Sequence, residues 1–436
     1  MSDYMFMLES HMTAAQTVAF HKVQEAANEA SLSLYLTGGA LRDMLGGFPI
    51  RELDFTVEGN AIALAKTIAK KGEADLGELD PRRNLADLQF PHHVTVRLGM
   101  ARQELYAKPA SKPQISPATI HEDLLCRDFT INAIAMSLNR QSRALLVDPA
   151  NGIGDVQNKE LRIVGKYTLY DDPSRIFRLF RYRVRMGYTL SEKTQSQYQN
   201  VRELKLEKKI PAEALGRELR NVANEANSAD IVKLLDEEKL LVMFCPALAG
   251  DKVNHPGLQK LQKARLNLPL ELEFPVDNLS LFLTVLTEKL NKNDRASLVK
   301  ECALTAEELT AWKKLEDGAK KLEKELKSPS LSRPSRVYAA AAKGTGAQIL
   351  YLLYKSDSRL VQDRLKNHLQ KYLMVEHELT EEEVLETGVK PGTPKYAKAR
   401  LVVLFKKLDA RPKKIVVEEV PPTPVLAAPI VASARR

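Results

Sequence analysis

Apolar residues repeat along this chain with two different periods. The spacing predicts a helix over residues 13–30, a strand over 31–36, a strand over 53–57 and a helix over 61–71. Residues 85–98 alternate between apolar and polar side chains, which predicts two more strands on either side of a turn. Together these elements predict an α+β unit of about 120 residues in the first part of the chain.

The pattern changes near Leu161. From there onward strand-like alternation is scarce, and apolar residues follow a helical period, as in the windows 231–242 and 281–290. This spacing predicts that the second part of the chain is entirely helical. Its helices are expected to end at segments that contain proline, namely Pro211, 246–256, 269–275, 328–334 and 391–394.

These two patterns divide the chain into four regions. We expect a mixed α/β head over residues 1–150, a helical neck over 151–225, and a helical body and tail over 226–410. The last residues, 411–436, mix Pro, Val and Ala without any period, and we expect them to be disordered.

The composition is that of a globular protein. Hydrophobic residues make up 44% of the 436 and charged residues 28%, which excludes wholesale disorder. The three cysteines, Cys126, Cys245 and Cys302, are far apart, so neither a disulfide framework nor a cysteine-rich zinc site is supported. The acidic N-terminal segment does not resemble a signal peptide, and no apolar run has the length of a membrane span. We therefore expect a cytoplasmic protein.

The first segment with candidate chemistry is GGALRD at residues 38–43, which precedes Glu52 and Asp54 on the next predicted strand. Paired glycines between a strand and a helix expose backbone N–H groups that a phosphate can approach, and Arg42 adds positive charge. Residues two apart on a strand face the same side, so the two carboxylates meet at one point. Carboxylates beside a phosphate cradle suit a two-Mg²⁺ phosphoryl-transfer site, although a simple turn and a solvated strand edge would have the same sequence.

Two further segments carry polar residues at suggestive spacings. They are CRDFTINAIAMSL at residues 126–138 and DDPSRIFRLFRYRVRMGY at residues 171–188. In the second, Asp172 and Arg175 lie three apart, so a helix would project both side chains from one face. An acceptor beside a donor can pair with the edge of a nucleobase. The same two residues can also form a local ion pair at a helix N-terminus.

Taken in order, these segments resemble the class II CCA-adding enzyme and bacterial poly(A) polymerase family of nucleotidyltransferases. The resemblance runs from about Leu34 to Tyr188, with a weaker similarity to the family's C-terminal helical motif at residues 388–404. It implies the α+β fold class, with a nucleotidyltransferase-type mixed α/β head followed by an all-helical neck, body and tail. It also implies attack of an RNA 3′-hydroxyl on the α-phosphate of a nucleotide, with release of pyrophosphate.

The resemblance assigns the phosphoryl-transfer chemistry to the first segment. Glu52 and Asp54 would be the catalytic residues and would hold Mg²⁺. Gly38 and Gly39 would cradle the incoming triphosphate, and Arg42 would help to bind it.

The later segments would bind the rest of the nucleotide. Arg127 and Asp128 match family positions that contact the ribose and phosphates. Asp171, Asp172 and Arg175 occupy the family's Glu-Asp-x-x-Arg motif, whose side chains pair with the Watson–Crick edges of CTP and ATP. Selection by side chains would need no nucleic-acid template.

This chain departs from the family pattern at three positions. Glu52 stands where the family has Asp, and Cys126 replaces the first Arg of the Arg-Arg-Asp segment. Arg97 stands where a strand of the family commonly supplies an acidic residue, and it could form ion pairs with Glu52 and Asp54 that compete with the metal. Asp87 on the preceding strand could instead supply a third carboxylate, but the sequence leaves the register of that hairpin open.

The local charge indicates an RNA partner. Between Lys166 and Arg220 there are thirteen basic and seven acidic residues, a net charge of +6 out of +9 for the whole chain. A basic helical surface beside the catalytic unit would bind RNA phosphates, and Arg178, Arg181 and Arg185 are the candidate residues. A solvated helix with internal ion pairs is the alternative explanation.

We therefore expect a template-independent RNA nucleotidyltransferase that adds CMP or AMP to the 3′ end of tRNA, with Mg²⁺ as cofactor and with ATP and CTP as nucleotides. The alternatives are a poly(A) polymerase of the same family and a catalytically impaired RNA-binding relative, in which Glu52 and Arg97 weaken the metal site. The motifs do not choose among CCA, CC-only, A-only and poly(A) addition. No membrane partner is expected, and the oligomeric state is left open.

Overall fold

A computed structural model describes residues 3–268 and 274–410 of the chain. The first part is built around one sheet of seven strands in the order β3-β4-β5-β2-β1-β8-β9. The neighbours β2 and β5 run parallel, and the other neighbouring strands are antiparallel. The strands are β1 (Ser33–Thr37), β2 (Leu53–Glu58), β3 (Asp75–Asp80), β4 (Leu85–Phe90), β5 (Val94–Met100), β8 (Ala135–Ser137) and β9 (Leu146–Val147).

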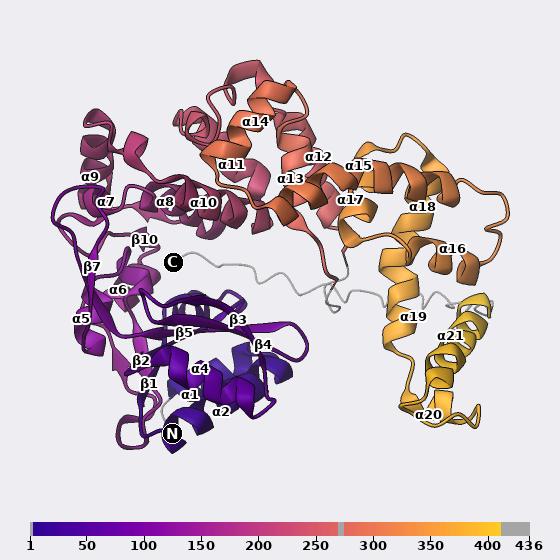
Figure 1. Cartoon of the computed structure of the whole chain (residues 1–436), viewed down its shortest axis with the longest axis horizontal. Helices are drawn as coiled ribbons and strands as arrows, with labels where there is room; N and C mark the ends of the chain where they lie inside the picture. Colours follow the sequence, from indigo (N-terminus) through magenta and orange to yellow (C-terminus); the bar gives the residue numbers. More distant parts are fainter. Residues whose placement is uncertain (1–2, 269–273, 411–436) are drawn as a thin grey trace, which may run out of the picture.

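Helices α2 (Ala14–Glu29) and α4 (Ala61–Lys70) cover one face of this sheet (Figure 1). Both begin at a side-chain cap, because the oxygens of Thr13 and Asn60 accept hydrogen bonds from backbone N–H groups of the first turn. The rings of Phe20 on α2 and Phe55 on β2 are 5.8 Å apart in the core between them. Because side chains alternate along β2, the polar residues next to Phe55 face the other side of the sheet. The shorter helices of this part are α1 (Asp3–His11) and α3 (Gly39–Leu45).

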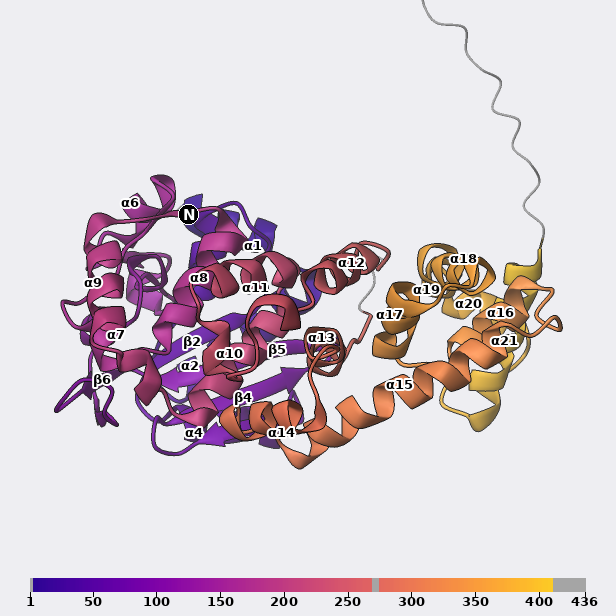
Figure 2. The same cartoon turned by 90° about the horizontal axis from the view of Figure 1, so that it is seen from above.

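Helices α8 (Arg175–Met186) and α10 (Ala212–Asn224) lie over this second face. Figure 2, seen from above, shows them across β2 and β5. Apolar residues at helical spacing on α8 and α10, such as Phe177 and Leu219, are buried, and the rings of Phe177 and Phe244 are 4.8 Å apart. The surrounding elements are β6 (Arg102–Leu105), β7 (Gln114–Pro117), α5 (Ile120–Leu125), α6 (Gly152–Gln157), β10 (Glu160–Leu161), α7 (Thr168–Asp171), β11 (Thr189–Leu190) and α9 (Glu192–Glu203).

Of the remaining helices, α11 (Ser228–Glu237) and α14 (Lys292–Glu301) pack on α8 and α10, and the helices from α15 (Ala306–Leu326) onward extend away from the head along the long axis of the molecule (Figures 1 and 2). One large hydrophobic core continues from the head into them, as far as Leu369. The bounds of the others are α12 (His255–Arg265), α13 (Asn278–Leu286), α16 (Pro334–Ala341), α17 (Gly346–Lys355), α18 (Arg359–Asn367), α19 (Leu373–His377), α20 (Glu381–Leu385) and α21 (Pro394–Asp409).

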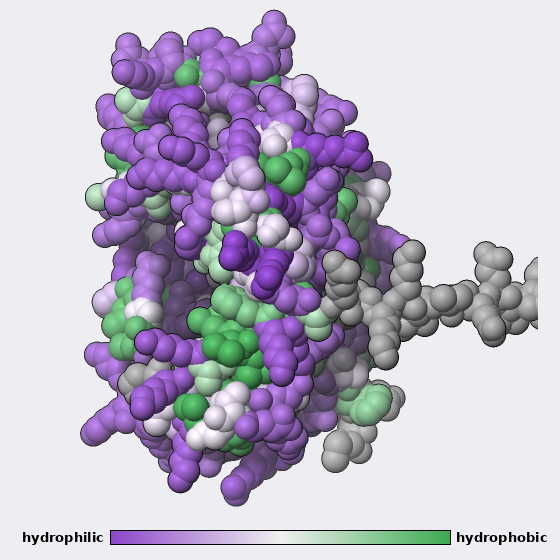
Figure 3. All heavy atoms as spheres, turned by 90° about the vertical axis from the view of Figure 1, so that its right-hand side faces the viewer, coloured by the Kyte–Doolittle hydropathy of each residue, from purple (hydrophilic) through white to green (hydrophobic). Residues whose placement is uncertain are grey.

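The end of the molecule away from the head has a small core of its own. It is formed by buried residues of α16, α20, α21 and the segment before α20, namely Tyr338, Leu379, Val384, Leu404 and Leu408. Figure 3 shows that the surface at this end is mostly hydrophilic, with one gathered hydrophobic patch. Large hydrophobic residues that are exposed on the helices here are Leu360, Leu385, Leu401 and Val402.

The structure confirms the predicted mixed head and a mostly helical second part, but the neck is not entirely helical as predicted, because the two-residue strands β10 and β11 pair there. The helices expected over 13–30 and 61–71 are α2 and α4, and the expected strands are β1, β2, β4 and β5. The prediction missed β3, an exposed edge strand without apolar alternation, the short strands β8 and β9, and the short hairpin β6–β7. The tail expected over 411–436 lies outside the described residues. Within those residues, none of the helices combines the length and the apolar character of a membrane span.

Candidate active site

A cavity of about 390 Å³ lies between the second face of the sheet and the helices α8 and α10. It is lined mostly by polar and charged residues, which include eleven of the predicted site residues. Those eleven are Gly38, Gly39, Arg42, Glu52, Asp54, Arg127, Asp128, Arg175, Arg178, Arg181 and Arg185, whereas the predicted Asp171 and Asp172 are not among the lining residues. Residues from the head and from the neck therefore meet in one cavity.

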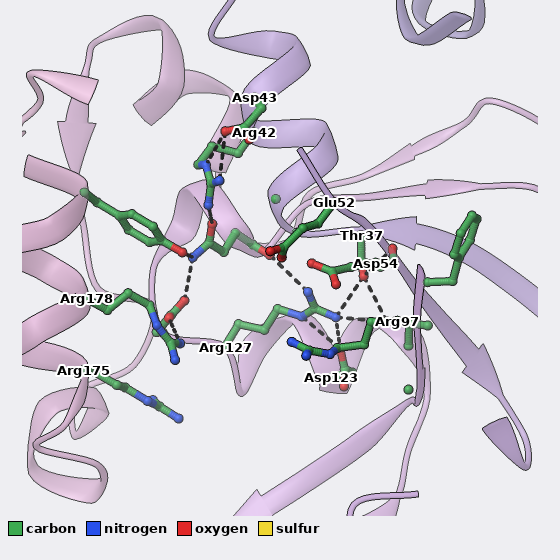
Figure 4. A pocket seen from close by; sticks show the side chains of 18 of the residues that line it. Thr37, Arg42, Asp43, Glu52, Asp54, Arg97, Asp123, Arg127, Arg175 and Arg178 are labelled. Carbon is green, nitrogen blue, oxygen red and sulfur yellow. Dashed lines mark hydrogen bonds and ion pairs between the residues drawn. The ribbon is translucent and has the colours of Figure 1, made fainter. Parts of the chain in front are cut away.

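Asp54 is the central carboxylate of the cavity. It lies on β2, with Glu52 immediately before the strand, and both side chains point into the cavity (Figure 4). The Oδ1 atom of Asp54 is inaccessible to solvent and has no hydrogen-bond partner among the described residues. Burial and then the charge of Glu52 raise the pKa of Asp54 to about 6, although nearby arginines act in the opposite direction.

The turn at Gly38 and Gly39 lies against this carboxylate. Gly38 has a φ of 67°, a left-handed conformation that favours glycine. A Cβ atom on Gly38 would lie 3.1 Å from Nη1 of Arg127, and a Cβ atom on either glycine would lie 3.7 Å from Oδ2 of Asp54. The missing side chains thus leave bare backbone beside Asp54 and Arg127.

Arg127 lies between the glycine turn and the sheet. Its guanidinium donates two hydrogen bonds to Oδ2 of Asp123, at 3.0 and 2.8 Å, and further ones to the hydroxyls of Thr37 and Thr56. The charge of Asp123 raises the pKa of Arg127 against the opposing effect of burial. Arg127 is therefore a fixed positive charge that faces Asp54.

Arg42 lies beside the glycine turn, since a Cβ atom on Gly39 would be 3.5 Å from its Nη2 atom, but its guanidinium is already engaged by other neighbours. Its guanidinium donates to Asp43 at 2.9 and 2.8 Å and to Oδ1 of Asn132 at 2.7 Å, and it lies 4.7 Å from the ring centre of Tyr182. The side chain is almost completely buried. Its predicted contact with a triphosphate stays a prediction, and any such contact has to share the guanidinium with these partners.

Asp128 joins the head to the neck. One of its oxygens accepts a hydrogen bond from Asn132 at 2.9 Å, and the other accepts one from Arg178 of α8 at 2.5 Å. The two arginines nearby, Arg178 and then Arg175, keep the pKa of Asp128 far below its ordinary range although the group is buried. Asp128 is thus an ionised carboxylate with its charge already paired, and its predicted role at the ribose stays a prediction.

The predicted nucleotide-selecting residues do not lie on one helix. Arg175 is the first residue of α8 and lines the cavity, whereas Asp171 ends α7 and Asp172 lies between the two helices. Oδ1 of Asp172 accepts hydrogen bonds from the backbone and hydroxyl of Ser174, and its Oδ2 is 3.7 Å from Nε of Arg175. The structure therefore brings Asp172 and Arg175 together, but through a turn before α8 rather than along a helical face.

The basic helix α8 differs from the expected open RNA-binding surface. Arg181 is buried and Arg185 nearly so, and their partners are Glu225 at 3.0 Å and Asp43 at 2.7 Å. Arg178 pairs with Glu218 in addition to Asp128. These arginines turn inward because acidic residues of the head and of α10 face them, so they line the cavity rather than an outer surface.

The sequence left open which carboxylate pairs with Arg97, and the structure shows that it is Asp87. Arg97 on β5 donates from Nε and Nη2 to the two carboxylate oxygens of Asp87 on β4, at 2.8 and 3.1 Å. Asp87, not Glu52 or Asp54, is thus the ion-pair partner of Arg97. These hydrogen bonds and the charges of the neighbouring carboxylates raise the pKa of Arg97. Asp87 is consequently not a free third carboxylate.

The arrangement fits a divalent cation beside Asp54. A buried carboxylate oxygen that lacks a partner, next to a second carboxylate, leaves negative charge that a cation would balance. Mg²⁺ is commonly bound through one or two carboxylates together with the phosphates of a substrate. Among residues 3–268 and 274–410, however, there is no group of three or more His, Cys, Asp or Glu side chains placed to hold a metal by themselves.

The sequence did not single out several residues that build this site. Asn132 and Tyr182 lie within the quoted segments 126–138 and 171–188 but were given no role, and Asp123, Glu218 and Glu225 lie outside any quoted segment. Each of the five holds one or two of the arginines described above. Of these residues, only Glu218 could have been found from the sequence. It lies on the apolar face of α10, and a buried carboxylate at such a position requires partners.

The chain is similar in sequence to known proteins. Residues 34–162 match the family described as the poly A polymerase head domain. The chain is 28% identical over 346 residues to an A-adding tRNA nucleotidyltransferase of Aquifex aeolicus, which covers 78% of this chain and 40% of that protein. It is 34% identical over 194 residues to an A-adding tRNA nucleotidyltransferase of Halalkalibacterium halodurans, which covers 44% of this chain and 45% of that protein.

A solved structure of a tRNA-processing enzyme complex is similar over most of its length. It matches with a TM-score of 0.53 and 26% identity, covering 88% of this chain and 100% of that one. By contrast, the chain spans less than half the length of the two curated relatives.

Proposed function

Because this chain belongs to the family of class II CCA-adding enzymes and bacterial poly(A) polymerases, we propose that it adds CMP or AMP to the 3′ end of tRNA without a nucleic-acid template. The observation that carries the proposal is the cavity in which the Glu52 and Asp54 carboxylates meet the Gly38-Gly39 turn and the guanidinium of Arg127. ATP and CTP are the proposed nucleotides.

In the proposed reaction the 3′-hydroxyl oxygen of the RNA forms a bond to the α-phosphorus of the nucleotide. The bond from that phosphorus to the oxygen bridging to the β-phosphate breaks, pyrophosphate leaves, and the hydroxyl proton passes to water. Glu52 and Asp54 would hold the divalent cation, proposed to be Mg²⁺, whose chemistry would be to neutralise charge on the phosphates. Positioning and charge stabilisation supply most of the catalysis in such a site.

The other cavity residues bind and orient the nucleotide in this proposal. The backbone at Gly38 and Gly39 lies beside the phosphates, and Arg127 contributes a positive charge that its hydrogen bonds hold in place. Asp128 lies at the ribose, where its ionised oxygens accept hydrogen bonds.

Nucleotide selection is proposed to lie at the start of α8. Arg175 provides donors toward the cavity, and Asp172, 3.7 Å away, and Asp171 provide acceptors. Burial raises the pKa of Asp171. Donors and acceptors of this kind match the polar edge of a nucleobase. We also propose a cytoplasmic location, in keeping with the three free cysteines.

The test is incorporation of labelled nucleotide. The full chain is incubated with Mg²⁺ and labelled CTP or ATP, together with tRNA that ends before the CCA sequence, after its first C or after its second C. Incorporation is expected into at least one of these substrates and not into an unrelated RNA of equal length. The Asp54→Ala protein should be inactive, and Asp75→Ala, on the exposed edge strand β3, is the matched control. Absence of incorporation with protein in excess over tRNA overturns the proposal.

A second candidate function is RNA binding without catalysis. The observation that favours it is Arg97, which stands where the family commonly places an acid and which occupies Asp87 as its partner. This candidate predicts that tRNA binds with the same affinity with and without Mg²⁺, and that no nucleotide is transferred. Poly(A) synthesis is the remaining alternative, and long A-only products on an unrelated RNA would identify it.

A further inference from the structure

Three strands bring three charged residues into one row on the cavity face of the sheet. In the register of β4, β5 and β2, Asp87 lies opposite Arg97 and Arg97 lies opposite Asp54. Opposed residues on neighbouring strands project to the same face with their Cβ atoms about 5 Å apart. The guanidinium of Arg97 is therefore next to the proposed cation ligands, and Figure 4 shows it on the same side of the cavity as Asp54 and Arg127.

Asp87 fixes the orientation of the Arg97 guanidinium. Its Nε and Nη2 atoms donate to the two oxygens of Asp87, which is the two-pronged geometry that guanidinium and carboxylate groups adopt in their strongest pairs. Nη1 has no hydrogen-bond partner among the residues that the structure describes. Half of the side chain is exposed and the residue lines the cavity, so a substrate can reach it.

This arrangement limits how many divalent cations the site can hold. Two cations about 4 Å apart, the usual spacing in phosphoryl transfer, need carboxylates that ligate both of them. Glu52 and Asp54 are two such groups, and the next position along the row is a positive charge. Asp87, which would be the third carboxylate, is already engaged by Arg97.

We propose that the site uses a single divalent cation and that Arg97, held by Asp87, supplies the second positive charge at the phosphate being transferred. The inference rests on the proposed function and specifies its chemistry. Nη1 of Arg97 donates to a non-bridging oxygen of the α-phosphate, where negative charge grows as the 3′-oxygen bonds to phosphorus and pyrophosphate leaves. The hydroxyl proton passes to water, as above. Asp87 is a positioning residue that aims the guanidinium.

Counting bound Mn²⁺ tests this directly. Electron paramagnetic resonance measures free Mn²⁺ during titration of the full chain, in the presence of a CTP analogue that cannot be cleaved between its α- and β-phosphates. The wild-type protein is expected to bind one Mn²⁺ per chain at the site, and Arg97→Glu is expected to bind two. Thr95→Glu is the matched control, since Thr95 is an exposed residue on the same face of β5, two positions away; it should still bind one.

Three further variants keep the test independent of whether Arg97→Glu folds. Arg97→Gln removes the charge without adding a ligand, so it should bind one Mn²⁺ while kcat falls at least 100-fold and KM for the nucleotide changes less than fivefold. Arg97→Lys should recover part of kcat. Asp87→Asn should lower kcat about tenfold without changing the Mn²⁺ count.

The outcomes separate this inference from the proposed function. Two Mn²⁺ ions bound to the wild-type protein, or a single ion bound to a folded Arg97→Glu protein, overturns the inference even if nucleotides are transferred. An unchanged kcat in Arg97→Gln overturns it as well. One Mn²⁺ ion without transfer to any RNA overturns the proposed function and leaves the cation count standing.

Discussion

Replacing Asp54 by Asn is expected to make the metal-free protein more stable, although it removes a residue of the proposed site. Burial and Glu52 raise the pKa of Asp54 from 3.8 to about 6. Because the pKa is higher in the folded chain than in the unfolded chain, the stability from the protonated carboxyl is fully present below pH 3.8 and is lost as the pH rises through 6. A shift of about two units corresponds to about 3 kcal/mol at neutral pH.

The assay is reversible unfolding of wild-type and Asp54→Asn proteins in urea, with a chelator present, at pH 5 and pH 8. The free energy of unfolding of the variant should exceed that of the wild type by about 3 kcal/mol at pH 8 and by about half as much at pH 5. Asp75→Asn, at an exposed position of β3, should change neither value by more than about 0.5 kcal/mol.

Adding Mg²⁺ extends the same test. A ligand that binds only the folded state raises its stability, so millimolar Mg²⁺ is expected to stabilise the wild type and to leave Asp54→Asn unchanged. A variant that is less stable than the wild type at pH 8 without metal would refute the reasoning, because Asp54 would then be stabilising the fold as an ordinary paired carboxylate.

Three other substitutions examine the catalytic pair, the selecting arginine and the joint between head and neck. Glu52→Asp is expected to keep or raise the rate of transfer, because the family has Asp there; a rate more than tenfold lower in the incorporation assay contradicts this. Arg175→Ala should reduce the discrimination between CTP and ATP at least tenfold with less than a twofold change in tRNA affinity, and equal losses of both would count against its selecting role. Glu225→Gln removes the negative charge that Arg51 and Arg181 share and should lower the free energy of unfolding by about 3 kcal/mol at pH 7. Since the pKa of Glu225 lies below its ordinary 4.5, this difference should shrink as the pH falls below that value in urea titrations, and a constant difference would be inconsistent with it.

Local patterns predicted the elements of the head well. The strand β2 and the helices α2 and α4 were placed to within two residues, because alternation and helical spacing record which face of each element is buried. The edge strand β3 was missed for the same reason, since most of its residues are exposed and its pairing with β4 depends on backbone hydrogen bonds rather than on apolar alternation.

The arginines of α8 show what local sequence patterns cannot predict, namely the environment of each charge. Their charge was counted correctly, but the count could not tell whether they face solvent or protein. Arg178 and Arg185 are held by Asp128 and Asp43, which lie 50 and 142 positions earlier in the chain. Such partners become neighbours only when the neck packs on the sheet, and this packing turns an expected outer surface into a cavity wall.

By itself, the sequence determined which residue types could do the chemistry: the glycine pair, the two carboxylates around Leu53 and the ordered motifs that resemble a nucleotidyltransferase family. Only the tertiary structure decided what each charge faces. The register of β4, β5 and β2 aligned Asp87, Arg97 and Asp54, which no spacing along the chain could specify, because the hairpin pattern fits more than one register. The same departure from the family pattern that suggested a damaged metal site is, in three dimensions, a guanidinium that Asp87 holds in place opposite Asp54, whose Oδ1 atom has no hydrogen-bond partner within residues 3–268 and 274–410.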